Sequence, residues 1–300
     1  MSRSDLVSVI IPTYNRAHLI GETIESVRAQ TIDNWEIIIV DDCSTDNTES
    51  LVHGFQDQRI RYIRIDHRGL IGKVRNIGME IANGSFIAFL DSDDLWEPNK
   101  LECQLNLFNE YPHIAFAFSH GKQFGAGAIP PPELEKFYLG NIFHAHLLEE
   151  RFVMYPSTFI FRKDVLNGME WFDENFSAGE SDFFLRMALT NDGVFVNEQL
   201  VRLRRHSKNV SRERDVIFSQ DNIKMIDKFL RRKYISKEEY IALASKQYYK
   251  QGLIFLKRSK PFDSLDAFRK YFGLKPFHYK GWMRLTQAWI LSLRSKQIPV

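Results

Sequence analysis

Residues 86–94 read Phe86-Ile87-Ala88-Phe89-Leu90-Asp91-Ser92-Asp93-Asp94, an apolar run that meets three carboxylates without a break. An uninterrupted apolar run of this length is typical of a strand that is covered on both faces of a sheet. Carboxylates at the mouth of such a strand repel one another, and burying them is costly unless a cation or hydrogen-bond donors neutralise them. The stretch therefore predicts a buried strand that ends at an acidic site.

Other short apolar runs precede this one, at residues 7–11, 37–40 and 60–65. Between the first two, apolar residues recur at helical spacing from Leu19 to Val27, so a helix there can cover one face of a sheet. Strands that alternate with helices indicate βαβ units. We therefore expect an α/β fold with a mainly parallel sheet, whose ligand site lies at the carboxyl ends of the strands.

The pattern loosens after residue 120, where Gly121, Gly125, Gly127 and the prolines 130–132 predict a loop. Beyond this loop the residue pattern predicts further strands and a helix. The strands are expected near 155–162, 194–196 and 200–204, and the helix over 180–191. The chain from residue 215 onward is helical in pattern and rich in Lys, Arg and aromatic residues.

These patterns predict two parts. A catalytic domain is expected over residues 1–211, with a nucleotide-binding half at about 1–120 and an acceptor half at about 120–211. A helical C-terminal region is expected over 212–300.

The composition is that of a globular protein, since 44% of the 300 residues are hydrophobic and 26% are charged. The net charge of +2 supplies no overall positive field, so we expect no nucleic-acid partner. Cys43 and Cys103 lie in unrelated segments without zinc-type spacing, which fits a reducing compartment. No stretch reaches the roughly 18 apolar residues of a membrane-spanning helix, and we expect a cytoplasmic protein.

Asp91, Asp93 and Asp94 are candidate ligands or neighbours of a divalent cation. Mg²⁺ and Mn²⁺ prefer oxygen ligands, and they typically bind through one or two carboxylates while substrate phosphates complete the shell. The alternative is an acidic turn that leads into a helix beginning near Pro98 and ending at about Phe108.

Two other segments also follow predicted strands. Asp41 and Asp42 come after residues 37–40, where a carboxylate can accept hydrogen bonds from a base or a ribose. Pro12, Thr13 and Tyr14 follow the first strand, and the Tyr14 ring offers a face on which a base can stack. The alternatives are a solvated loop in which Ser44 or Thr45 caps a helix, and a Tyr14 that is simply a core aromatic.

Cations and carboxylates at predicted helix starts complete the candidate set. Lys73 and Arg75 could face a diphosphate or a base, or they could form a solvated helix face. Glu180 and Asp182 open a helix, where acids favour the helix dipole even without function, and where a carboxylate could instead deprotonate an acceptor hydroxyl. His206, in Arg204-Arg205-His206, could bind a phosphate or a metal, or could be a surface residue.

Four segments, in this order, resemble the family 2 glycosyltransferases of GT-A fold. They are residues 7–16 with Pro12-Thr13-Tyr14, 40–46 with Asp41-Asp42, 75–78 with Arg75-Asn76-Ile77-Gly78, and 89–94 with Asp91-Ser92-Asp93-Asp94. The resemblance is strong from residue 6 to about 110 and extends more loosely to about 211. It implies a GT-A (Rossmann-like) mixed, mainly parallel sheet flanked by helices, with a C-terminal helical appendage. The implied reaction is an inverting transfer from a nucleoside-diphosphate sugar, with a UDP-sugar favoured.

The same resemblance implies roles for the candidate residues. Asp42 would recognise the base, with Pro12, Thr13 and Tyr14 beside it and Lys73 and Arg75 lining the nucleotide pocket. Asp91 would contact the ribose or assist the metal, Asp93 would ligate Mn²⁺ or Mg²⁺, and Asp94 would shape the donor-sugar pocket. His206 belongs to an Arg-x-His element near the phosphates and is a further candidate metal ligand.

The sequence departs from the family pattern at two places. The catalytic base usually comes from a Glu-Asp pair, whereas this chain has Glu180-Ser181-Asp182, so either Glu180 or Asp182 could be the base. Cys43 stands where Gly or another small residue is frequent. The acceptor implied is a hydroxyl of a glycan or a lipid-linked molecule, in bacterial polysaccharide synthesis.

Rival functions differ in the motifs they need. A nucleotidyltransferase would be expected to carry a Gly-rich loop with a basic residue after the first strand, and residues 12–16 contain no glycine. A dinucleotide dehydrogenase is disfavoured because no G-x-G-x-x-G follows that strand. A non-catalytic nucleotide- or glycan-binding module on the same fold stays open, because the Glu180-Ser181-Asp182 segment is irregular.

The C-terminal segment 275–296 predicts an amphipathic helix. Trp282, Leu285, Trp289 and Leu293 share one face, with Lys and Arg residues nearby. Such a stripe either packs onto the catalytic domain or docks at a membrane surface, which would suit a lipid-linked acceptor. The sequence thus leaves open a peripheral position at the inner face of the membrane.

Overall fold

The computed structural model divides the chain by its contacts into two compact units, Met1–Ser207 and Lys208–Val300. The boundary predicted from the sequence lies between residues 211 and 212. The structure describes residues 5–130, 136–148, 152–177, 179–205, 215–277 and 279–295.

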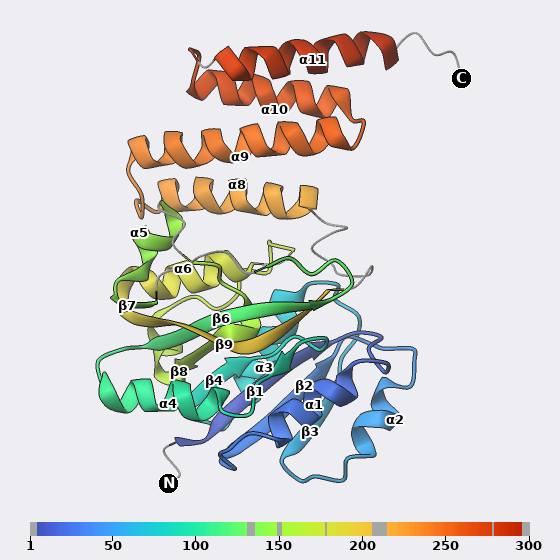
Figure 1. Ribbon diagram of the computed structural model, residues 1–300, viewed down its shortest axis with the longest axis vertical. Coiled ribbons are helices and arrows are strands. Elements are labelled where there is room, and N and C mark those ends of the chain that lie inside the picture. Colours follow the sequence, from blue (N-terminus) through green and yellow to red (C-terminus); the bar gives the residue numbers. More distant parts are fainter. Residues whose placement is uncertain are drawn as a thin grey trace. The chain divides into compact units, whose positions relative to one another are not determined.

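The first unit is built on one mixed sheet (Figure 1). Within the described residues it has nine strands in the order β3-β2-β1-β4-β8-β6-β9-β5, with β7 beside β9. The strands are β1 (Val7–Thr13), β2 (Trp35–Asp41), β3 (Ile60–Arg64), β4 (Phe86–Phe89), β5 (Leu95–Trp96), β6 (Phe116–Gly125), β7 (Phe137–Gly140), β8 (Phe159–Arg162) and β9 (Gly193–Arg205). Strands β3, β2, β1 and β4 are parallel, and β8 runs antiparallel to both β4 and β6.

Helices cover both faces of this sheet, which explains why every residue of β1 and β2 is buried. Val7, Val9 and Ile11 lie in one core cluster with the buried face of α1 (Ile20–Arg28) and residues of α4 (Lys100–Glu110). The opposite face of β1 meets α3 (Ile71–Ile81), where a side chain on Gly78 would strike Ile10. The short helices are α2 (Thr48–His53) and α5 (Ile142–Leu147), and two 3₁₀ turns are Pro156–Thr158 and Lys163–Gly168. The predicted α/β fold is confirmed.

Stacked phenylalanine rings attach α6 (Glu180–Thr190) to the sheet. Phe184 of α6 stacks on Phe159 of β8 with ring centroids 3.8 Å apart, and Phe159 stacks on Phe118 of β6 at 4.7 Å. Phe183 stacks on Phe172 at 4.1 Å, so the first turn of α6 is fixed from two sides. This packing holds Glu180, the first residue of α6, at the carboxyl edge of the sheet.

The predicted loop after residue 120 is wrong for residues 121–125, because β6 continues through them to Gly125 and pairs with β9. A Cβ atom on Gly121 would lie 2.6 Å from Leu203 Cδ1, so the glycine makes room for Leu203 of the neighbouring strand. The two strands predicted near 194–196 and 200–204 are one strand, β9, with a register irregularity opposite Ser119–Gly121. The helix expected from Pro98 begins at Lys100.

The second unit contains α8 (Asp215–Arg231), α9 (Lys237–Lys257), α10 (Pro261–Leu274) and α11 (Tyr279–Ser295). A capping box between Ser236 and Glu239 begins α9, where each side chain accepts a hydrogen bond from the other residue's main-chain N–H. Phe268 of α10 packs close to Gly252 of α9 and shares a small core with Leu265 and Ala288. None of the helices in the described ranges combines the length and the apolar character that a membrane crossing requires.

Candidate active site

The end of β2 presents two aspartates with different partners. Asp41 is fully buried, accepts a hydrogen bond from the Ser44 main-chain N–H at 2.8 Å and accepts another from the Tyr62 hydroxyl. Asp42 accepts from the main-chain N–H groups of Arg68 at 2.6 Å and Gly69 at 2.9 Å. Asp41 thus stabilises the loop that follows β2. The Asp42 carboxylate is instead oriented by the segment that leads into α3.

The end of β1 lies beside Asp42. The Thr13 carbonyl accepts a hydrogen bond from the Asp42 main-chain N–H at 2.9 Å, and Tyr14 follows with 44% of its surface exposed. The Tyr14 ring lies 4.9 Å from the ring of His67, whose Nδ1 is 3.0 Å from an Asp42 carboxylate oxygen. Pro12 and Thr13 are buried in β1. The structure therefore brings these predicted residues together, with Tyr14 presenting a half-exposed aromatic face.

Arg75 joins the end of β4 to the start of α6. Its guanidinium is fully buried and donates to Asp91 at 2.7 Å and to Glu180 at 2.7 Å. The rings of Phe89 and Phe172 lie 5.6 and 5.7 Å from its Cζ atom. One cation from α3 thus fixes two carboxylates that are far apart in the sequence.

Burial and mutual repulsion disfavour the ionised forms of Asp91 and Asp94. Burial raises the pKa of Asp91, and repulsion from Asp93 and Glu180 adds to this, while Arg75 opposes it. Burial also raises the pKa of Asp94 well above its usual range, together with repulsion from Asp93 and Asp91. Cation binding would relieve both effects, because an added positive charge favours the ionised form of each carboxyl group.

Asp94 is held by groups from two distant segments. The Ser157 hydroxyl donates to one carboxylate oxygen at 2.6 Å, and the Arg204 main-chain N–H donates to the other at 2.9 Å. Ser157 also accepts from the Asp91 main-chain N–H at 3.1 Å. Sequence reasoning missed Ser157 and His67, because a serine in a turn and a histidine in a loop carry no local signal of these contacts.

Asp182 and Lys73 are placed differently from Glu180 and Arg75. The Asp182 side chain is buried and accepts from Arg186 Nε at 2.8 Å, and Arg186 also donates to the carbonyl oxygens of Glu170 and Trp171. Lys73 Nζ lies 2.8 Å from Glu174, at a partly exposed position. Arg204 Nε donates to the Asp93 carbonyl at 2.9 Å. His206 lies outside the described residues.

The carboxylates after β4 are oxygen ligands of the kind that Mg²⁺ and Mn²⁺ prefer. Among the residues that the structure describes, no group of three or more His, Cys, Asp or Glu side chains is arranged to hold a metal ion. Mg²⁺ does not need such a group, because it usually binds one or two carboxylates together with substrate phosphates. Asp91 and Asp93 can supply that number of carboxylates.

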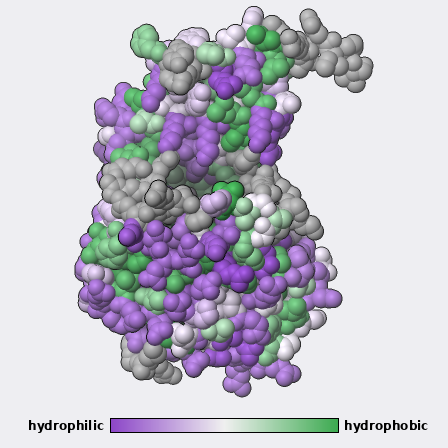
Figure 2. All heavy atoms as spheres, in the orientation of Figure 1, coloured by the Kyte–Doolittle hydropathy of each residue, from purple (hydrophilic) through white to green (hydrophobic). Residues whose placement is uncertain are grey.

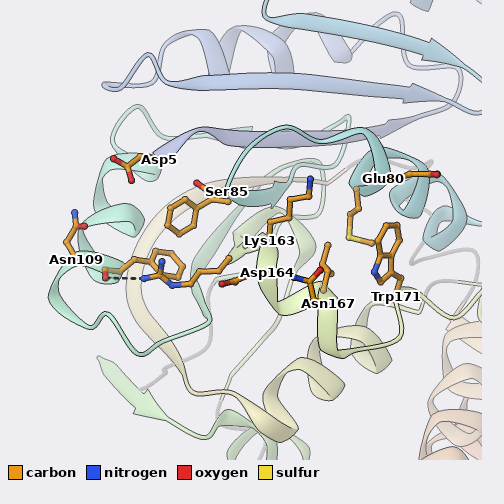
Figure 3. A pocket seen from close by; sticks show the side chains of 13 residues that line it. Asp5, Glu80, Ser85, Asn109, Lys163, Asp164, Asn167 and Trp171 are labelled. Atoms are coloured by element: carbon orange, nitrogen blue, oxygen red, sulfur yellow. Dashed lines mark hydrogen bonds between the residues drawn. The ribbon is translucent and has the colours of Figure 1, made fainter. Parts of the chain in front are cut away.

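A separate cavity of about 660 Å³ lies at the opposite edge of the sheet (Figure 3). Its lining includes Ser85, which precedes β4, and Lys163 and Asp164, which follow the antiparallel strand β8. These positions are at the amino ends of the parallel strands. Among the described residues, none of the candidate site residues lines this cavity.

Comparison with known proteins agrees with the order of the motifs. The profile described as "Glycosyl transferase family 2" matches residues 8–169, which is more than half of the chain. The chain belongs to glycosyl transferase family 2. The resemblance of the four segments to this family is confirmed.

Two curated relatives match between 34% and 38% of the chain. The Escherichia coli protein named UDP-Glc:alpha-D-GlcNAc-diphosphoundecaprenol beta-1,3-glucosyltransferase WfgD is 46% identical over 102 residues, which cover 34% of this chain and 40% of that protein. The putative teichuronic acid biosynthesis glycosyltransferase TuaG of Bacillus subtilis is 43% identical over 116 residues, covering 38% of this chain and 46% of that protein. The matched part therefore spans less than half the length of these two relatives.

A solved structure shares the fold over more of the chain. S. aureus TarS 1–349 in complex with UDP-GlcNAc superposes with a TM-score of 0.71 at 19% identity, covering 90% of this chain and 81% of that chain. At this identity the likeness shows the fold alone, and it confirms the GT-A prediction.

Proposed function

We propose that this chain transfers a sugar from a nucleoside-diphosphate donor, with a UDP-sugar favoured, to a hydroxyl group of a glycan or lipid-linked acceptor in bacterial polysaccharide synthesis. The observation that carries the proposal is the Arg75 bridge, which ties Asp91 at the end of β4 to Glu180 at the start of α6 with 2.7 Å contacts on both sides. The name of the WfgD relative, which specifies a UDP-glucose donor and a diphosphoundecaprenol-linked acceptor, supports the classes of donor and acceptor.

The nucleotide binds at the ends of β1 and β2 in this proposal. Asp42 already accepts hydrogen bonds from two main-chain N–H groups, and a carboxylate has about four lone-pair sites, so it can accept another from a base N–H. The half-exposed ring of Tyr14 provides a stacking face next to it. Lys73 lies partly exposed on the same helix as Arg75, and it would reach the diphosphate only by leaving Glu174.

Asp91 and Asp93 are the residues that would hold a Mn²⁺ or Mg²⁺ ion at the diphosphate. Such an ion would offset the negative charge that grows on the departing diphosphate. The raised pKa values of Asp91 and Asp94 support a cation at this position. Burial and mutual repulsion disfavour the ionised form of both carboxyl groups, and a bound cation would favour it. Asp94, fixed by Ser157 and Arg204, would face the donor sugar.

The transfer is a direct displacement with inversion. The acceptor oxygen forms a bond to the anomeric carbon while the bond from that carbon to the diphosphate oxygen breaks, and the nucleoside diphosphate leaves with the electron pair. Glu180 takes the proton of the acceptor hydroxyl. We assign this role to Glu180 rather than Asp182, because the Asp182 carboxylate is buried in its pair with Arg186, whereas the Glu180 side chain is 20% exposed.

Paired variants test the assignment of the base. Glu180→Gln should lower the rate of sugar transfer on the order of 10²–10⁴-fold, the usual contribution of a general base, while UDP affinity stays near that of the wild type. Asp182→Asn should lower the melting temperature, because it removes the charge partner of a buried arginine, and should have less effect on UDP binding. The measurement is product formation from a panel of nucleotide sugars with Mn²⁺, followed by the melting temperature of each variant.

Transfer at the wild-type rate by Glu180→Gln would remove this carboxylate from the mechanism. UDP binding without transfer from any donor of the panel would instead favour the non-catalytic binding module.

A further inference from the structure

Helix α11 exposes an apolar strip formed by Trp282, Met283, Trp289 and Ile290. The small residues Ala288 and Ser292 are buried. In contrast, the large apolar side chains of Trp282, Met283, Trp289 and Ile290 are 50%, 67%, 52% and 42% exposed. Trp282 and Trp289 are seven residues apart, and so are Met283 and Ile290, so the two pairs form adjacent rows along the helix. Hydrophobic residues reach the surface beside hydrophilic ones at the α11 end of the second unit (Figure 2).

The strip occurs in the longest stretch of the chain without an acidic residue. Residues 267–300 contain no Asp or Glu, and their cations are Arg269, Lys270, Lys275, Lys280, Arg284, Arg294 and Lys296. Because the net charge of the whole chain is +2, the remaining residues together are net negative. The positive charge of this protein is therefore concentrated where its apolar strip is exposed. Lys275 and Arg284 are themselves exposed.

Trp282 is fixed by its neighbours while half of its surface stays exposed. Trp282 stacks on Phe272 of α10 at 4.2 Å, and its indole N–H donates to the Pro276 carbonyl at 3.0 Å. A groove of about 220 Å³ between α10 and α11 is lined by Trp282, Trp289, Leu265, Leu285, Thr286 and Arg269. The groove thus places two tryptophan rings near Arg269, whose guanidinium can bind a phosphate.

We propose that α11 docks this chain on an anionic phospholipid surface, with Trp282 and Trp289 at the level of the headgroups and the cations against lipid phosphates. Tryptophan favours the membrane interface, and an exposed apolar strip beside Lys and Arg is the pattern of helices that lie in that interface. A second copy of this chain would bring the same positive charge against the strip, so the charge disfavours self-association through α11. The proposal does not depend on the sugar-transfer reaction, and either could fail alone.

The test is sedimentation of the full chain with vesicles of two compositions. One contains equal parts of phosphatidylglycerol and phosphatidylcholine, and the other contains phosphatidylcholine alone. We expect the wild type to bind the anionic vesicles at least tenfold more tightly, because each Lys or Arg near an anionic surface contributes about fivefold, and salt should weaken the binding.

Two double variants separate the apolar and electrostatic parts. Trp289→Ser with Ile290→Ser, and Lys275→Glu with Arg284→Glu, should each lower binding to the anionic vesicles at least tenfold. The matched controls are Ile129→Ser, at a 62% exposed position of the first unit, and Lys237→Glu, at the exposed start of α9. Both controls should bind as the wild type does. Circular dichroism melts of all variants show whether the helices remain folded.

Equal binding of the wild type to both kinds of vesicle, or wild-type binding by both double variants when they are folded, would overturn the proposal. Absence of vesicle binding together with a dimer that dissociates in the α11 variants would also overturn it, and would identify the strip as a contact between copies.

Discussion

Arg75 is the residue that connects Asp91, at the proposed donor site, with Glu180, the proposed base. It carries the buried charge that two carboxylates share, and two of its N–H groups are used in 2.7 Å contacts. Within the described residues its buried Nε atom has no hydrogen-bond partner, and the rings of Phe89 and Phe172 lie near the guanidinium instead. The planar fork of arginine can bridge two acceptors that a lysine ammonium cannot reach together.

Arg75→Lys should therefore preserve the charge and lose the bridge. We expect the free energy of unfolding to fall by about 1.5–3 kcal/mol, the contribution of a hydrogen bond to a charged group, and sugar transfer to fall with it. Urea denaturation of the purified variant measures the change. Lys73→Met is the control, because the partly exposed pair with Glu174 should contribute less than about 1 kcal/mol. Equal effects of the two substitutions would contradict the special role of Arg75.

Cys43 illustrates a departure from the family pattern that has a backbone cause. Its φ angle is +68°, in the left-handed region that glycine adopts without steric cost. This explains why Gly or another small residue is frequent there.

Asp182 is a residue whose partner the local sequence does indicate. Its spacing of four residues from Arg186 is a signal of an ion pair on one helix face, and its burial in that pair leaves Glu180 as the more exposed of the two carboxylates.

At the scale of elements, close approach between α3 and β1 positions Arg75. A Cβ atom on Gly78 would lie 2.5 Å from Ile10 Cγ2, far inside contact distance. Gly78→Ala would normally stabilise a helix interior by about 0.5–1 kcal/mol. Here we expect it to destabilise by about 1–3 kcal/mol, because the overpacked methyl group must push α3 from the sheet.

Thermal or urea denaturation of Gly78→Ala, Ile10→Ala and the double variant measures this coupling. The double variant should be less destabilised than the sum of the single variants, since removing the Ile10 side chain makes room for the methyl group. A stabilised Gly78→Ala would show that the two elements are not in close contact.

Glu36 links β2 to β1 and to the turn before β4. It accepts hydrogen bonds from the Ser8 hydroxyl at 2.6 Å and from the Asn83 main-chain and side-chain N–H groups. Burial alone would raise the pKa of Glu36, but these hydrogen bonds, together with Arg61, lower it from 4.5. The ionised form is therefore favoured in the folded state.

The sign of the pH dependence follows from this lowered pKa. The stabilisation by Glu36 is present above pH 4.5 and is lost as the pH falls through the folded-state value. Glu36→Gln should thus be less stable than the wild type at pH 7, and the difference should shrink below pH 4.5. Urea midpoints of both proteins at pH 7 and pH 4 test this. A difference that grows on acidification would show that the pKa is raised instead.

The parallel half of the sheet could be predicted from the sequence because β1, β2 and β4 are short, largely apolar runs, and helical spacing separates the first two. The other half could be predicted only in part: strands were expected near 155–162, 194–196 and 200–204, but β6 and β7 were not, because they depend on distant partners. Gly121 predicts a loop when considered alone, and it belongs to a strand only because Leu203 fills the space beside it. In the same way, the contacts of Ser157 with Asp91 and Asp94 come from a turn more than 60 residues further along the chain.

At the scale of the whole molecule, the chain combines a GT-A unit with a helical unit of different surface chemistry. The first unit gathers carboxylates at the ends of β2 and β4, and the second carries the cations and exposed tryptophans of α10 and α11. This division suits a reaction in which a soluble nucleotide sugar meets an acceptor at a lipid surface. Under the two proposals, the donor would be recognised independently of α11.

The central claim is that the carboxyl ends of β2 and β4 form one nucleotide-diphosphate site. Calorimetric titration of UDP into the purified chain with Mn²⁺ tests it most directly, using the wild type, Asp42→Asn at β2 and Asp93→Asn after β4. Each substitution should weaken UDP binding by about tenfold or more, which corresponds to about 1.4 kcal/mol, and only Asp93→Asn should abolish the dependence on Mn²⁺. Wild-type affinity in both variants would contradict the claim.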